Sequence, residues 1–246
     1  MKEFEKKWQS RFQRYGRHHQ TDHLISGWSE RGLRRRLVLF EKLLSERVLP
    51  TPAQALDLGC GAGNYVRLLS GLKHRVVGLD YSIPTLHRAL ESDSQRVGMY
   101  VGGGAYNLPF KDGSFDLVVS IGVFQVLNCV EKALHEMIRV LKPKGLLVIE
   151  FLNALEVIAL SRAIAERITG RRPRLYSYTA SQVQGLFIQH GLKILRRAGV
   201  YIPPRRFAWL ERILNLEAFV GVMEGIPGLA SVVAHAFILV GEKESG

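Results

Sequence analysis

Residues 55–64 read Ala-Leu-Asp-Leu-Gly-Cys-Gly-Ala-Gly-Asn, and this stretch decides the fold. An apolar run ends in an acid, and three glycines at alternate positions follow before helix-forming sequence resumes. A strand that passes through a tight turn into a helix has this pattern, because glycine adopts backbone conformations that a side chain would block. We expect the turn to bring backbone N–H groups and a helix N-terminus against a ligand.

Short apolar runs alternate with helical stretches around this turn. We predict strands at residues 53–58, 74–80, 98–102, 115–121, 145–152, 192–201 and 232–240. Alternation of this kind is typical of a mostly parallel sheet with helices on both faces. The predicted fold class is therefore α/β, with a doubly wound, seven-stranded sheet.

The domain organisation has three parts. Residues 1–50 are predicted to form an N-terminal helical cap, residues 51–152 a ligand-binding core, and residues 153–246 the C-terminal part of the same domain. A helical insertion at 203–230 precedes the last strand, and further helices are expected near 1–20, 30–49, 153–169 and 180–190. The first helix carries an aromatic stripe, because helical spacing places these four side chains on one face: Phe4, Trp8, Phe12 and Tyr15.

Charge is unevenly distributed along the 246 residues, whose net charge is +12. Residues 1–50 hold 12 basic and 6 acidic side chains, and residues 151–212 hold 11 and 3, whereas residues 51–150 are nearly neutral. Basic flanks of this kind attract phosphates, an anionic membrane surface or RNA, and they equally keep a protein in solution. Composition alone leaves these readings open.

The cellular compartment is predicted from what the chain lacks. No apolar run reaches the roughly 20 residues that span a bilayer, and residues 1–7 contain no apolar secretory core. The two cysteines, Cys60 and Cys129, show no metal-ligand spacing and no disulfide framework. We therefore expect a cytoplasmic protein without a bound metal.

A second acid lies where a nucleotide ribose would bind. Asp80 ends the second predicted strand, and an acid at this position can accept hydrogen bonds from both ribose hydroxyls. Two features argue against a dinucleotide. Asn64 stands where the dinucleotide fingerprint has Gly or Ala, and Asp57 at the end of the first strand would repel a pyrophosphate. A cofactor with a cationic end fits better.

Four segments in order now resemble a known family. They are residues 56–63, 78–80, 107–118 (Asn-Leu-Pro-Phe-Lys-Asp-Gly-Ser-Phe-Asp-Leu-Val) and 139–145 (Arg-Val-Leu-Lys-Pro-Lys-Gly). Together they look like the class I S-adenosylmethionine-dependent methyltransferases, and most like the group with the ubiquinone and menaquinone biosynthesis enzymes (methyltransferase type 11 domain). The resemblance covers roughly residues 50–150. It implies a Rossmann-like methyltransferase fold, an enzyme, and S-adenosylmethionine as cofactor.

The resemblance also implies a cofactor site built from strand ends. Its members would be Asp57, Gly59, Gly61 and Gly63 around the methionine moiety, Asp80 at the ribose hydroxyls, Tyr81, Gly104, Ala105 and Tyr106 around the adenine, and Ile121 near the methionine portion. Gly104 departs from the family pattern, since many relatives carry Asp or Asn there to bind the adenine amino group. We further expect residues 1–20 to close over the cofactor, with Tyr15 as the direct contact.

Methyl transfer from a sulfonium is an in-line displacement, so the enzyme mainly aligns the reactants in a dry pocket. A general base is needed only if the acceptor is not already nucleophilic. The sequence contains no catalytic dyad, and Glu150 at the end of the fifth strand is the candidate base.

The predicted function is methylation of a small hydrophobic or anionic acceptor that is lipid-, quinone- or saccharide-like. Its pocket would be formed by the N-terminal helices and residues 203–230. One alternative is an RNA or tRNA methyltransferase that uses the basic flanks, although no RNA-binding module is recognisable. Another is a cofactor-binding relative without catalysis, which only Gly104 supports. The acceptor and the oligomeric state stay open.

Overall fold

A computed structural model describes residues 3–19, 21–171, 173–202, 217–226 and 228–245. The first half of the chain contains α1 (Glu3–His18), α2 (Asp22–Ile25), α3 (Glu30–Ser45), β1 (Gln54–Leu58), α4 (Asn64–Gly71), β2 (Arg75–Asp80), α5 (Ile83–Ser92), β3 (Met99–Gly102) and β4 (Phe115–Ser120). The second half contains η1 (Phe124–Val126), α6 (Val130–Val140), β5 (Leu141–Leu152), α7 (Val157–Thr169), α8 (Ala180–Gln189), β6 (Leu192–Val200), α10 (Glu217–Gly225), α11 (Leu229–Val233) and β7 (Ala236–Lys243).

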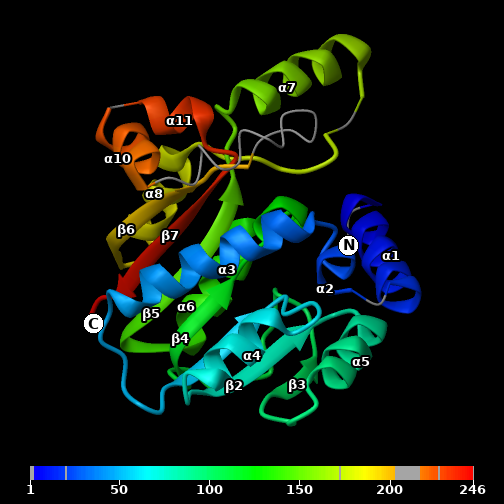
Figure 1. Cartoon of the computed structure of the whole chain (residues 1–246), viewed down its shortest axis with the longest axis vertical. Coiled ribbons are helices and arrows are strands. Elements are labelled where there is room, and N and C mark those ends of the chain that lie inside the picture. Colours follow the sequence, from blue (N-terminus) through cyan, green and yellow to red (C-terminus); the bar gives the residue numbers. More distant parts are fainter. Residues whose placement is uncertain (1–2, 20, 172, 203–216, 227, 246) are drawn as a thin grey trace.

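The strands form one seven-stranded sheet in the order β3-β2-β1-β4-β5-β7-β6 (Figure 1). Neighbouring strands from β3 to β5 are parallel, whereas β7 runs antiparallel to both β5 and β6. The strand order reverses between β1 and β4, which lie side by side and lead into helices on opposite faces. This mostly parallel, doubly wound sheet confirms the predicted fold class.

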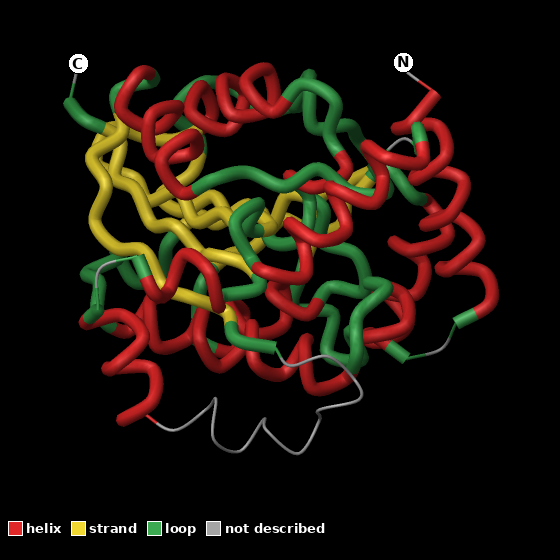
Figure 2. Tube along the Cα trace, turned by 90° about the horizontal axis from the view of Figure 1, so that it is seen from above, coloured by secondary structure: helices red, strands yellow, loops and turns green. Residues whose placement is uncertain are grey.

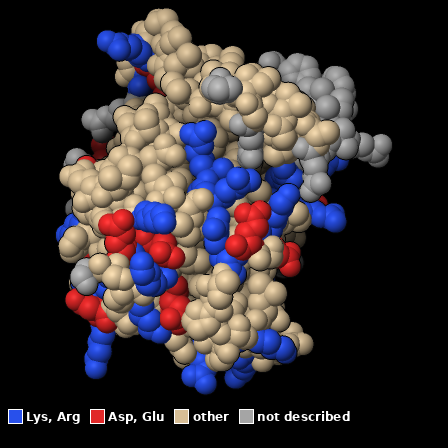
Figure 3. All heavy atoms as spheres, turned by 90° about the vertical axis from the view of Figure 1, so that its left-hand side faces the viewer, with Lys and Arg blue, Asp and Glu red and all other residues tan. Residues whose placement is uncertain are grey.

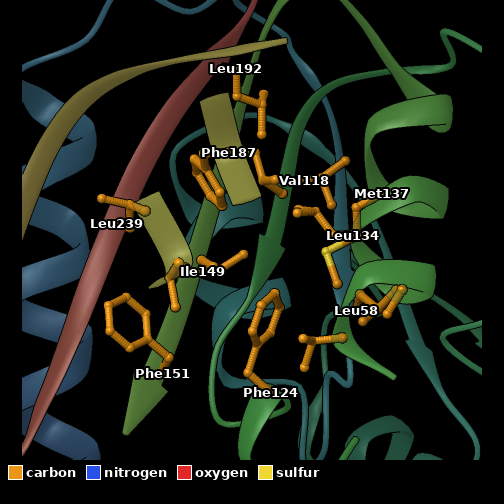
Figure 4. Close-up of a cluster of buried hydrophobic side chains, with 14 of the residues drawn as sticks. Leu58, Val118, Phe124, Leu134, Met137, Ile149, Phe151, Phe187, Leu192 and Leu239 are labelled. Atoms are coloured by element: carbon orange, nitrogen blue, oxygen red, sulfur yellow. The ribbon is translucent and has the colours of Figure 1, made fainter. Parts of the chain in front are cut away.

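Helices cover both faces of the sheet, and Figure 2 shows the strands as a middle layer. On one face α3, α4 and α5 pack against the strands through side chains such as Phe40, Val66 and Leu86. On the other face α6 and α8 bury Leu134, Met137, Val183 and Phe187 against the sheet (Figure 4). Strands with both faces covered need apolar residues at successive positions, which explains the continuous apolar runs of β4 and β5.

Several element boundaries differ from the sequence predictions. β5 begins at Leu141 and not at residue 145, and α7 begins at Val157 and not at residue 153. Two further differences have a clear cause. The helix expected at 30–49 ends at Ser45, and Val48 beyond it is fully exposed. Leu44 is the last buried residue of α3, so no further apolar contact supports another turn. The strand expected from residue 232 begins at Ala236, which pairs with Leu152 and Val200 at the ends of the neighbouring strands. Residues 229–233 therefore have no strand to pair with, and they form α11.

The insertion predicted at 203–230 is described only in its second part, as α10 and α11. Five apolar residues of this segment lie outside the described residues: Phe207, Trp209, Leu210, Ile213 and Leu214. Phe219 on α10 packs edge-on against Tyr201, with ring centroids 6.0 Å apart. Within the described parts of the chain, no helix combines the length and the apolar character that crossing a membrane requires.

Candidate functional site

A cavity of about 600 Å³ opens at the carboxyl ends of β1, β2 and β4, where the strand order reverses. Ligands of open α/β sheets bind at this kind of position. The strand ends and the loops that follow them contribute Leu58, Gly59, Cys60, Gly61, Leu79, Asp80, Tyr81, Gly103, Gly104, Ala105, Tyr106, Asn107, Ile121, Gly122 and Val123 to the cavity lining. The N-terminal cap adds Glu5, Trp8, Gln9, Phe12, Ile25, Ser26 and Trp28.

The glycine turn forms a floor of bare backbone. Gly59 has φ +77°, and a Cβ there would lie 2.3 Å from a methyl group of Val123. The amides of Gly59 and Cys60 both donate to the carbonyl of Leu79, at 2.7 and 3.0 Å. These N–H groups are therefore committed to holding β1 against β2, which corrects the expectation that they face a ligand. What the turn offers a ligand is close approach to the backbone.

Gly63 lies behind the turn and not at the cavity surface. It is the N-cap of α4 with φ +80°, and a Cβ there would lie 2.7 Å from the hydroxyl of Tyr100. Its lack of a side chain therefore serves the packing of α4 against β3, whereas Gly59 and Gly61 line the cavity.

Asp80 lines the cavity with a carboxylate that the protein has already oriented. Its Oδ2 accepts the Gly61 amide at 3.0 Å, and its Oδ1 accepts the Ser82 amide at 2.8 Å. Burial raises the pKa of Asp80, while these backbone donors lower it. A carboxylate has about four acceptor positions, so beside these backbone donors Asp80 can still accept from a ligand hydroxyl.

Asp57 is buried beneath the turn, outside the cavity lining. Only 1% of its surface is exposed, and its Oδ2 has no hydrogen-bond partner among the described residues. Burial, together with the nearby charge of Asp80, raises the pKa of Asp57 to about 8. An unpartnered buried carboxylate oxygen is costly, and a cationic group at the floor would stabilise its charged form.

The roof of the cavity is α1. Trp8 and Phe12 line the cavity together with Glu5 and Gln9, whereas Tyr15, the predicted contact, does not. Tyr15 lies about one turn further along α1, where its hydroxyl accepts from Arg11 Nε and its ring contacts His19 at 5.0 Å. The aromatic stripe of α1 therefore reaches the cavity through Trp8 and Phe12 and not through Tyr15.

Specific contacts hold α1 in place over the cavity. The hydroxyl of Tyr106 donates to Glu5, whose Oε1 also accepts the Asn128 amide at 2.8 Å. The hydroxyl of Tyr81 donates to the carbonyl of Trp8 at 3.3 Å. Near the other end of the helix, Arg88 Nε donates to the carbonyl of Gly16 at 3.0 Å. Burial is the largest cause of a raised pKa for both Tyr81 and Tyr106, so both are neutral hydrogen-bonding groups here.

The remaining predicted cofactor residues lie together. Gly104, Ala105, Tyr106 and Ile121 all line the cavity. A Cβ at Gly104 would meet no atom within 4 Å, so its backbone borders open space and no side chain approaches it. The departure from the family pattern at this position leaves room in the cavity without obstructing it.

Glu150 is wrong as a candidate base. Its side chain is fully buried, and its Oε1 forms an ion pair with Arg36 Nε at 2.6 Å, on the sheet face covered by α3. It does not line the cavity. Side chains alternate between the two faces of a strand, and Glu150 follows Ile149, which faces the opposite core. Removing one partner of such a buried pair would cost folding energy.

Trp28 was missed by the sequence analysis. It lines the cavity, and a Cβ at Gly122 would lie 2.4 Å from its ring. The guanidinium of Arg36 lies 4.4 Å from its ring centroid, so the buried ion pair supports the aromatic wall from behind. No periodic pattern marks Trp28, because it lies in the connection just before Ser29, the N-cap of α3.

The residues present fit S-adenosylmethionine. Asp80 offers acceptor capacity to a ribose, and Tyr81, with Phe12 packed edge-on against it, offers an aromatic ring to a base. The glycine floor permits close approach, and the unpartnered Asp57 oxygen favours a positive charge nearby. Within the described residues, no three His, Cys, Asp or Glu side chains come together as a possible metal site.

Comparisons with known proteins agree with this geometry. Residues 56–149 match the model of a family described as a methyltransferase domain. A demethylmenaquinone methyltransferase of Lactiplantibacillus plantarum is 43% identical over 109 residues, which are 41% of this chain and 45% of that protein. The chain therefore spans less than half the length of this curated relative. The resemblance to class I S-adenosylmethionine-dependent methyltransferases is confirmed.

Solved structures extend the likeness of the fold beyond the matched segment. The magnesium protoporphyrin IX methyltransferase of Synechocystis, solved with SAH bound, has a TM-score of 0.63 at 14% identity and covers 98% of this chain and 96% of its own. The [4+2]-cyclase SpnF has a TM-score of 0.62 at 20% identity, with 85% and 81% covered. At these identities the likeness shows the fold alone. The second protein is named a cyclase although it has a similar fold, so the fold does not determine which reaction is catalysed.

Proposed function

We propose that this chain, through the methyltransferase domain at residues 56–149, transfers a methyl group from S-adenosylmethionine to a small, largely apolar acceptor. One observation carries the proposal. The glycine floor and Asp80, which lie in the matched segment, and the aromatic roof, which does not, face the same cavity of about 600 Å³. A volume of this size suits a small-molecule site.

S-adenosylmethionine, when bound, supplies a methyl group on a positively charged sulfonium. Asp80 would hold the ribose through the acceptor positions that its backbone donors leave free. Tyr81, against which Phe12 packs edge-on with ring centroids 6.5 Å apart, would flank the adenine on one side, and Gly104 would offer it a backbone carbonyl. Asp57 lies beneath the floor and would stabilise the cationic end of the cofactor through its charge.

The acceptor side of the cavity is apolar. Ile25, Trp28, Val123, Val126 and Leu127 line it without adding a charge. Such a wall suits a hydrophobic ring or chain more than a saccharide. The name of the Lactiplantibacillus relative, a demethylmenaquinone methyltransferase, supports a quinone-like acceptor among the possible classes.

The chain's own contribution to the reaction is alignment and exclusion of water. Glu5 and Asp80 are the carboxylates of the cavity lining, and both accept hydrogen bonds from backbone amides. The lining of the described residues contains no histidine. The site therefore favours an acceptor that arrives already nucleophilic, such as a reduced quinol with an electron-rich ring or an ionised hydroxyl. α1 keeps bulk water away from the floor.

An acceptor screen tests this function. Purified protein is incubated with S-adenosylmethionine and, separately, with reduced naphthoquinols, fatty acyl thioesters, saccharides and RNA, while release of S-adenosylhomocysteine is followed. Asp80→Ala is the matched control, because it removes the ribose contact. We expect release with an apolar ring or acyl acceptor and not with the control variant.

Two results would contradict the proposal. Transfer to RNA alone would assign the basic flanks to nucleic acid and the activity to RNA methylation. Cofactor binding in calorimetry without transfer to any acceptor class would favour a cofactor-binding relative that lacks catalysis.

A further inference from the structure

We propose that α7 is a docking surface for an anionic lipid bilayer. Four apolar side chains form a stripe along this helix, at spacings of three, four and four residues: Val157, Leu160, Ile164 and Ile168. Their exposed fractions are 65%, 48%, 55% and 80%. Helical spacing places all four on one face, so α7 presents a continuous apolar stripe to solvent.

The stripe points away from the body of the molecule. Ala159 is the buried residue of α7, and Glu166 is partly buried, about two turns further on. Both lie on the side of the helix opposite the stripe, since they follow Val157 by two and nine positions at about 100° per residue. In Figure 1 α7 projects from the top of the molecule, clear of the sheet. An ordinary surface helix would place its apolar face toward the core.

Charge around the stripe favours an anionic partner. Residues 157–174 contain five arginines and one glutamate. Arg162, Arg167, Arg171 and Arg174 are all exposed. In Figure 3, which shares its vertical direction with Figure 1, the upper end outside the grey atoms is mostly uncharged surface, with basic side chains and a smaller acidic area near its tip. An apolar stripe with arginines beside it matches the acyl boundary and phosphate headgroups of a bilayer. RNA would use the arginines but would leave the stripe in water.

The docking surface is connected to the roof of the cavity. The carbonyl of Arg174, in the segment that follows α7, accepts the Trp8 indole N–H at 3.1 Å. The ring of Tyr176 lies 4.6 Å from that of Phe4, and its hydroxyl donates to Asn128 at 3.1 Å. A bilayer held by α7 would therefore lie next to the helix that covers the cavity. Delivery of a lipid-dissolved acceptor at this edge rests on the proposed function, whereas docking does not.

Vesicle flotation with the full chain tests docking without any turnover. Vesicles of phosphatidylcholine with phosphatidylglycerol are compared with vesicles of phosphatidylcholine alone. The test variant is the double substitution Ile164→Ser with Ile168→Ser. Ile188→Ser on α8 is the matched control, because Ile188 is also an exposed isoleucine, at 67%. A second variant, Arg167→Gln with Arg171→Gln, tests the charge.

We expect binding to the anionic vesicles, at least a tenfold loss of partitioning in the double isoleucine variant, and wild-type partitioning in the control. The arginine variant should lose binding several-fold, and all variants should keep the wild-type melting temperature. Equal flotation of wild type and the double isoleucine variant would overturn the proposal.

Three other results would show that something other than a bilayer contacts α7, and each would overturn the proposal. A dimer in light scattering that the double isoleucine variant converts to a monomer would assign the stripe to a second copy of the chain. A fall in melting temperature in that variant, without any vesicle binding by the wild type, would assign it to packing within the chain. RNA binding that depends on the arginines but not on the isoleucines, in the absence of flotation, would assign the charge to nucleic acid.

Discussion

The helices α1 and α7 each carry an apolar stripe, but the surroundings of the two stripes are opposite. Neither helix takes part in the sheet. The stripe of α1 faces inward, where Trp8 and Phe12 cover the cavity. The stripe of α7 faces outward, and Ile168 at its end is 80% exposed. An amphipathic pattern therefore predicts a helix with an apolar face, but it does not identify what covers that face.

The two helices are attached to the body of the molecule by different contacts. Glu5 fixes α1 to Tyr106 and Asn128, and Arg88 fixes its other end through the Gly16 carbonyl. Gly16 also lets α1 approach α5 closely, because a Cβ there would lie 2.6 Å from the Thr85 amide. The buried contact of α7 with the body is made at Ala159. A short side chain and few anchors, as far as the described residues go, leave this helix free to contact something outside the molecule.

Deleting residues 1–20 tests the inward helix and should have the largest effect. The sheet and its two cores do not depend on α1, so the truncated protein should remain folded by circular dichroism. Turnover should fall by roughly 10²-fold or more, because reactants in an open cavity are neither aligned nor dry. Methylation of the acceptor at the wild-type rate by the truncated chain would contradict the role given to α1.

A substitution in the cavity floor should weaken cofactor binding without removing α1. Asp80→Ala removes the ribose contact and leaves the Gly61 and Ser82 amides without their acceptor. We expect cofactor affinity to fall by about 1–3 kcal/mol in calorimetry. Ile164→Ser on α7 is the control and should bind the cofactor as the wild type does. Unchanged affinity in Asp80→Ala would remove this residue from the cofactor site.

A substitution beneath the cavity floor should change how stability depends on pH, whereas a substitution on α7 should not. The folded protein raises the pKa of Asp57 from 3.8 to about 8, so the folded state binds this proton more tightly than the unfolded state does. Its contribution to stability is therefore present below about pH 4 and is lost as pH rises to about 8, by roughly 1.4 kcal/mol per pH unit. Asp57→Asn should flatten this decline in urea unfolding, measured without cofactor.

Ile164→Ser should instead keep the wild-type pH slope, since α7 is far from the floor in the fold. A decline of equal steepness in Asp57→Asn and in the wild type would mean that other groups cause the pH dependence.

Substitutions in the exposed stripe of α7 should have the smallest effect on the free energy of unfolding. Ile164→Ser or Ile168→Ser should change the free energy of unfolding by less than about 0.5 kcal/mol, because these side chains are already in water. Phe40→Ala in the core beneath α3 should cost about 3–5 kcal/mol in the same denaturation experiment. A loss above about 1.5 kcal/mol in either isoleucine variant would show that α7 is packed against something within the chain.

Sequence predicted the sheet and the glycine turn after β1, for a physical reason. Strands buried on both faces need unbroken apolar runs, and the turn after β1 needs glycine where Val123 approaches, so both leave local traces. Glu150 was misassigned because its partner Arg36 lies 114 positions away, and long-range pairing leaves no local trace. Helical spacing predicts which side chains share one face of α1, but it does not predict which of them reaches the cavity. It therefore could not distinguish Trp8 from Tyr15.

The position of β7 determines when the sheet can be completed during synthesis. β7 comprises residues 236–243, yet it pairs with β5 on one side and β6 on the other. During synthesis both partners leave the ribosome earlier and must wait with open edges until β7 emerges. Open edges are templates for association with other chains, so a nascent chain stalled before residue 236 would be prone to aggregate. Premature stops in this stretch should therefore act as loss of the whole sheet, however far they lie from the cavity.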